Sequence, residues 1–120
     1  MQESDEWWEQ ANKDLKAAKS NFLTKEYNVA SFLSQQAAEK ALKALILEKY
    51  NSLPKEHDLV LLANKLNLPK NIIQLCKDLT PVYIETRYPD VNGFKQYTKK
   101  ESEKDIEMAE EILECIKKQI

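Results

Sequence analysis

Glycine, histidine and arginine are each represented once, by Gly93, His57 and Arg87, and there are four prolines among 120 residues. So little glycine and proline excludes a many-stranded sandwich or barrel, because the tight turns of such folds depend on these residues. One histidine and two widely separated cysteines do not provide the ligand spacing of a His/Cys metal site. We therefore expect neither a metal nor a cofactor, and any chemistry that needs histidine or arginine must use His57 or Arg87.

A strong net charge and long hydrophobic runs are also lacking. Eighteen basic residues face twenty acidic ones, for a net charge of −2, so no overall positive field attracts nucleic acid or acidic membranes, although a local basic patch is compatible with this balance. No apolar run approaches the ~18–20 residues that span a bilayer, and the N-terminus lacks the features of a secretory signal. We expect a cytoplasmic protein without membrane contact, in which Cys76 and Cys115 are reduced and buried.

Apolar residues recur every three or four positions along most of the chain, which predicts helices. The two long runs cover residues 5–23 and 26–51, and the second is apolar around so much of its circumference that it belongs at the centre of a bundle. Trp7 and Trp8 are adjacent and cannot both face one core, so one of them is expected at the rim or in a subunit contact.

Local signals mark the ends of the shorter helices. Asp58 is placed to cap a helix of about ten residues, and Pro69 suits the first turn of the next one. Pro81 should kink or end that helix near residues 78–80, with continuation as a bent segment the other possibility. Residues 98–101 form a capping box that opens a closing helix. The sequence therefore predicts an all-α fold, an up-and-down bundle of four to five helices forming a single domain over residues 1–120.

Residues 87–97 form the one substantial loop, which holds the only glycine, a proline and three aromatic residues. Arg87 begins it, and a guanidinium offers a planar set of donors that holds phosphate in two-point contact. The alternative is that Arg87 pairs with Asp90 and braces a turn. The residues alone leave both interpretations open.

Two other polar residues have competing interpretations. His57 could act as a general base, but it directly precedes a predicted helix, so we favour a local cap or a packing role. Lys40 borders the buried stripe of the second helix and could line a cleft with Arg87. We favour the simpler interpretation, an inter-helix hydrogen bond there beside a Glu39–Lys43 pair four residues apart.

Three motifs, in this order, resemble the HEPN domain family of prokaryotes: residues 36–45 (Gln-Ala-Ala-Glu-Lys-Ala-Leu-Lys-Ala-Leu), His57-Asp58-Leu59 and Arg87-Tyr88-Pro89-Asp90. The likeness extends from the region of Trp8 to residues 109–113, which is nearly the whole chain. It implies a bundle of four or five helices, usually dimeric and often encoded beside a small nucleotidyltransferase with which it acts as a toxin–antitoxin pair. Some family members are metal-independent ribonucleases.

The resemblance also implies which residues matter. Ribonuclease members carry a histidine separated from the arginine by four to six residues, and those places after Arg87 hold Asn92, Gly93 and Phe94, none of which exchanges a proton near neutral pH. A toxin subgroup carries a modified tyrosine two residues after that histidine, where this chain has Phe94, and Tyr97 lies three residues further on. The nuclease motif is therefore incomplete, and we lean against an enzyme.

We expect a HEPN-like domain that forms a homodimer and binds a nucleotide, RNA or a small nucleotidyltransferase as one half of a toxin–antitoxin pair. Arg87 is the principal phosphate contact in this interpretation, and the other expected ligand contacts are Tyr88, Asp90, Asn92 and Lys40. One alternative is a metal-independent ribonuclease that uses His57 or Tyr97 as its base, if the fold brings either residue close to Arg87. The other is a purely structural adaptor.

Overall fold

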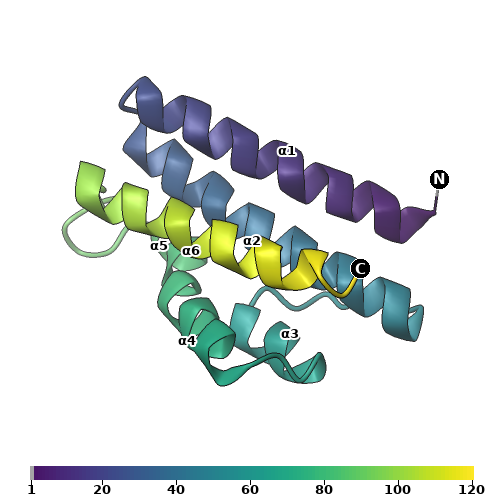
Figure 1. Cartoon of the computed structure of the whole chain (residues 1–120). Helices are drawn as coiled ribbons and strands as arrows, with labels where there is room; N and C mark the ends of the chain where they lie inside the picture. The colour runs from purple at the N-terminus through teal and green to yellow at the C-terminus, as the bar shows by residue number, and fades with distance from the viewer. Residues whose placement is uncertain (1) are drawn as a thin grey trace.

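The computed structural model describes residues 2–120, and in this part of the chain it contains helices and no β-strand (Figure 1). The all-α prediction is therefore confirmed. The helical segments are α1 (Glu3–Leu23), α2 (Tyr27–Tyr50), α3 (Leu59–Lys65), α4 (Lys70–Leu79), α5 (Pro81–Glu85) and α6 (Lys99–Lys117). Thr80 keeps helical dihedral angles between α4 and α5, so these two segments form one helix bent at Pro81 and the bundle has five helices.

The three long helices set the architecture. In Figure 1, α2 and α6 run in the same direction and α1 runs opposite to both, while α3, α4 and α5 together return the chain along the lower side. This returning leg is broken because Pro69 and Pro81 interrupt it. Helix α2 packs against α1, α3, α5 and α6, as its apolar circumference predicts. The largest fully buried apolar side chains are Leu42, Leu45, Leu59, Leu62, Leu79, Ile112 and Ile116.

The helix ends follow local capping rules with small shifts. The Asp58 carboxylate accepts hydrogen bonds from the amides of Val60 and Leu61, and Thr98 and Glu101 form the reciprocal capping box, both as predicted. Helix α1 begins two residues earlier than expected. Pro69 stands one residue before α4 rather than in its first turn.

The loop between α5 and α6 is held at its base and free at its tip. The Asn28 side chain donates to the carbonyl of Lys95 (2.9 Å) and accepts from the amide of Tyr97 (2.8 Å). Val82 is the only buried side chain of α5, and all residues from 87 to 94 are exposed. At the tip, Asp90 and Gly93 exchange two backbone hydrogen bonds of 3.0 Å, and Gly93 has the positive φ of 94° that favours glycine.

Both cysteines are free thiols, as predicted. Cys76 is buried, and burial raises the pKa of its thiol to about 12, whereas Cys115 is only partly covered. Among residues 2–120, no helix combines the length and the hydropathy needed to cross a membrane.

Candidate functional site

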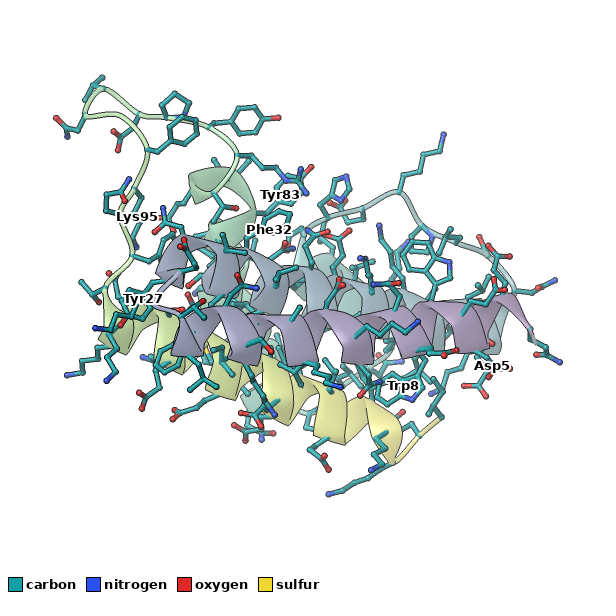
Figure 2. The ribbon with its side chains drawn as sticks, turned by 90° about the horizontal axis from the view of Figure 1, so that it is seen from above. Asp5, Trp8, Tyr27, Phe32, Tyr83 and Lys95 are labelled. Carbon is teal, nitrogen blue, oxygen red and sulfur yellow. The ribbon has the colours of Figure 1, made fainter. Side chains whose placement is uncertain are left out.

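The guanidinium of Arg87 lies over two aromatic rings. Its guanidinium carbon is 4.3 Å from the centroid of Tyr83 and 5.3 Å from that of Phe32. Figure 2 shows these two rings side by side, on the same side of α1 as the loop that follows α5. Arg87 forms no ion pair with any carboxylate of residues 2–120, and Asp90 instead accepts from the amide of Asn92 (2.7 Å). The structure therefore does not show the turn brace, and the stacked guanidinium keeps its donors available for a ligand.

His57 shares one aromatic neighbour with Arg87. Its imidazole stacks on Tyr83, with ring centroids 4.6 Å apart and planes inclined by 15°. Its Nδ1 lies 2.9 Å from Oε2 of Glu39, and about half of the side chain is exposed. When Nδ1 carries the hydrogen and donates it to Glu39, Nε2 remains a proton acceptor. The packing role favoured for His57 is present, and the fold also brings the residue to the ring on which Arg87 lies.

A buried polar network on α2 holds this histidine. Glu39, Lys43 and Gln35 are each at least 94% buried. Oε2 of Glu39 accepts from Nζ of Lys43 (3.0 Å), and its Oε1 accepts from the amide of Gln35 (3.1 Å), which itself accepts from Gln36 (2.7 Å). The spacing of four residues places Gln35, Glu39 and Lys43 on one side of the helix. With His57, Glu39 has three hydrogen-bonding partners, so its position is well determined.

Lys40 occupies a different place. Its Nζ lies 2.6 Å from Oδ2 of Asp14 in α1, and Oδ1 of Asp14 accepts from Gln10 (2.9 Å). The inter-helix bond that we favoured for Lys40 is thus present. Lys40 lines a shallow depression with Glu6, Trp7 and Gln10, and Arg87 does not border it.

The remaining expected ligand contacts lie at the tip of the loop. Tyr88, Asp90 and Asn92 border one open hollow of about 390 Å³, together with Ile84 and Phe94. Tyr88 is well exposed, whereas the Asp90 carboxylate is engaged by the backbone of its own turn. Arg87 does not border this hollow, because its guanidinium lies over Tyr83 and over Phe32 of α2.

Tyr97 is buried, and its hydroxyl donates to Glu85 (2.9 Å). Burial and this acidic neighbour raise the pKa of the phenol, so Tyr97 is poorly suited to accept a proton or a modifying group. It borders a separate cavity of about 480 Å³ that also exposes Glu101 and Asp105.

The profile of the HEPN domain family matches residues 4–119. This chain belongs to the HEPN domain family. No curated protein matches it.

Solved structures agree with this assignment. The HEPN chain is similar over its full length to TT1696 from Thermus thermophilus, with 30% identity, a TM-score of 0.90 and 100% of both chains covered. It is also similar to ST0689, an archaeal HEPN homologue, with 33% identity, a TM-score of 0.84 and coverage of 99% of this chain and 98% of that one. A HEPN domain protein from Thermotoga maritima, tm0613, shares the fold at 24% identity and a TM-score of 0.77, with coverage of 95% of this chain and 96% of that one.

The sequence did not indicate two residues of this site, Phe32 and Tyr83, nor the bond from His57 to Glu39. A signal existed for Tyr83, because residues four apart on a helix share a face and Tyr83 precedes Arg87 by four. Pro81 obscured it, since the sequence did not settle whether the helix resumed beyond that proline. Phe32 meets Arg87 across more than fifty residues, and no local pattern predicts such a contact.

Proposed function

We propose that this HEPN domain binds the phosphate-bearing part of a nucleotide or of RNA at the surface formed by Arg87, Tyr83, Phe32 and His57, hereafter the Arg87 surface. The proposal rests on the position of the Arg87 guanidinium. It lies over two aromatic rings and forms no ion pair with any carboxylate of residues 2–120. Such a group forms charge-assisted, two-point hydrogen bonds with phosphate. The adjacent aromatic rings provide faces for stacking a base.

The Arg87→Ala variant tests this function. Loss of charge-assisted hydrogen bonds is expected to weaken binding of adenosine or uridine monophosphate about 10- to 100-fold in calorimetric titrations, with Arg87→Lys intermediate because an ammonium lacks the planar fork. Because Arg87 is exposed, the melting temperature should stay close to that of the parent. Lys118→Ala, which removes an exposed cation at the end of α6, serves as the matched control. Equal affinity of Arg87→Ala and the parent contradicts the proposal.

The wider setting that we propose is a homodimer that acts in the cytoplasm with a small nucleotidyltransferase as a toxin–antitoxin pair. The support for this setting is membership of the HEPN domain family, whose prokaryotic members are usually dimeric and often encoded beside a small nucleotidyltransferase. Co-expression with the neighbouring open reading frame followed by affinity capture tests the partner. Capture of a transferase together with no nucleotide affinity would instead support the structural adaptor.

A second candidate function, metal-independent RNA cleavage, is favoured by the contact between Glu39 and His57. Nε2 of His57 would take the proton of a ribose 2′-hydroxyl, and the 2′-oxygen would attack phosphorus while Arg87 stabilises the developing charge. The P–O5′ bond would break to leave a 2′,3′-cyclic phosphate, and the departing 5′-oxygen would take up a proton from water. This function predicts cleavage of RNA in the presence of EDTA that His57→Ala abolishes and Asn92→Ala preserves. Intact RNA at every pH tested would eliminate it.

A further inference from the structure

Trp7 lies on a different side of α1 from its neighbour Trp8. Trp8 packs against the main core and lines a groove with residues of α6, and Figure 2 shows it across α1 from Phe32 and Tyr83. Trp7 is partly exposed, with Nζ of Lys43 6.0 Å from its ring centroid. It borders the depression of about 240 Å³ that also includes Gln10 and Lys40. Trp7 therefore presents an indole beside a hollow on the α2 side of α1.

A continuous series of contacts joins Trp7 to the Arg87 surface. Lys43 lies over Trp7 and bonds to Glu39, which holds His57 against Tyr83. On α2, Lys43 and Phe32 are eleven residues apart, which is slightly more than three full turns, so they share one side of the helix about 16 Å apart. Lys43 and Glu39 are buried beneath this side of α2, where the partly exposed residues are Phe32, Gln36 and Lys40, spaced four apart. Lys40 borders the depression beside Trp7, so aromatic rings stand at both ends of one strip of surface.

We propose that Trp7 is a second, base-stacking subsite of this HEPN domain, and that its ligand is a single-stranded nucleic acid several nucleotides long. The inference rests on the proposed function of the Arg87 surface, where a phosphate would bind. A mononucleotide held at Arg87 does not extend along the strip to Trp7, whereas a short strand reaches both places. Aromatic rings bind single strands by stacking on successive bases with little regard to sequence.

The charges along the strip indicate that stacking, rather than phosphate attraction, supplies the affinity. Lys40 is paired with Asp14 and Lys43 with Glu39, and Glu6 adds a negative charge at the depression. Arg87 has no carboxylate partner among residues 2–120 and His57 shares Glu39 with Lys43, so these two side chains supply at most two phosphate contacts on this strip. Since single strands lose about 0.7 in log affinity per log unit of salt for each phosphate contact, the expected slope is no steeper than about −1.4.

Tryptophan fluorescence provides the test, because Trp7 and Trp8 are the only two tryptophans and face different surroundings. We expect an adenosine hexanucleotide RNA to quench the fluorescence of the parent and of Trp8→Phe, but not that of Trp7→Phe. Trp7→Ala should weaken hexanucleotide binding about tenfold while leaving the affinity for adenosine monophosphate unchanged. Leu23→Ala, which removes an exposed apolar side chain at the far end of α1, is the surface control.

Three outcomes overturn the inference: hexanucleotide binding unaffected by Trp7→Ala, quenching that persists in Trp7→Phe, or a salt slope much steeper than about −1.4. A changed oligomeric state of Trp7→Ala with intact RNA binding would assign Trp7 to a protein contact and overturn it too. Failure here is distinguishable from failure of the proposed function. If monophosphate binding still depends on Arg87, the Arg87 surface stands and only the Trp7 subsite is lost.

Discussion

Glu39→Ala is expected to lower the free energy of unfolding by about 3–5 kcal/mol, the cost of breaking a buried ion pair by removing one partner. The Lys43 ammonium, whose side chain is 7% exposed, would lose its carboxylate, and the Gln35 amide would lose its acceptor. His57 would also lose the group that orients its ring. Urea unfolding monitored by circular dichroism measures the change.

Two comparisons make this expectation specific. Glu48→Ala removes an exposed carboxylate from the same helix and should change stability by less than about 0.5 kcal/mol. A double-mutant cycle of Glu39→Ala and Lys43→Ala should show the two losses to be strongly non-additive, because the second substitution removes the stranded charge. Additive losses would mean that the pair contributes nothing beyond its separate side chains.

The second large effect is a pH dependence of stability that arises from Asp105. This residue is 7% exposed, and one of its carboxylate oxygens, Oδ2, has no hydrogen-bond partner among residues 2–120. Burial raises its pKa from 3.8 to about 6, against the lowering effects of the Ser31 hydroxyl and Lys95. The folded protein therefore keeps a proton here over a pH range in which the unfolded chain releases it.

The sign follows from this difference. Well below pH 3.8 both the folded and the unfolded state hold the proton, and Asp105 does not change the free energy of unfolding. Between pH 3.8 and about 6 the unfolded state ionises and the folded state does not, so the free energy of unfolding falls as pH rises. Above about pH 6 the full penalty applies, roughly 1–3 kcal/mol for a shift of this size.

Asp105→Asn isolates this effect, because an amide resembles the protonated acid and does not ionise. Relative to the parent, the variant should gain roughly 1–3 kcal/mol above about pH 7 and almost nothing near pH 4, as measured by urea unfolding across the range. Asp78→Asn, at an exposed position on the cavity of about 480 Å³ that Asp105 also lines, should show no such pH trend. A constant difference between Asp105→Asn and the parent at all pH values would refute the assignment.

What the sequence could predict of this HEPN domain was local. Asp58 and the Thr98–Glu101 pair each bond to amides two or three residues away, so their sequence positions were enough to place the starts of α3 and α6. The central position of α2 likewise followed from its own apolar circumference.

The candidate site was only partly predictable, because its defining contacts are long-range. The sequence singled out Arg87 as the only arginine, but its stacking on Phe32 depends on how α5 lies across α2. The bond between His57 and Glu39 depends on the path of the segment that follows α2. The sequence also required a partner for Lys40, and only the packing of α1 on α2 identified it as Asp14.

Val82 is the only buried side chain of α5, and residues 87 to 94 are all exposed. This arrangement separates the stability of the bundle from the composition of the loop. The buried core is built by the helices, the short α3 and α4 included, whereas residues 87–94 are exposed and take no part in it. Substitutions between residues 88 and 94, except at Gly93 with its positive φ, should therefore change the chemistry of the loop surface at little energetic cost to the bundle. One rigid scaffold can in this way carry loops of different specificity, and selection can act on the loop without endangering the fold.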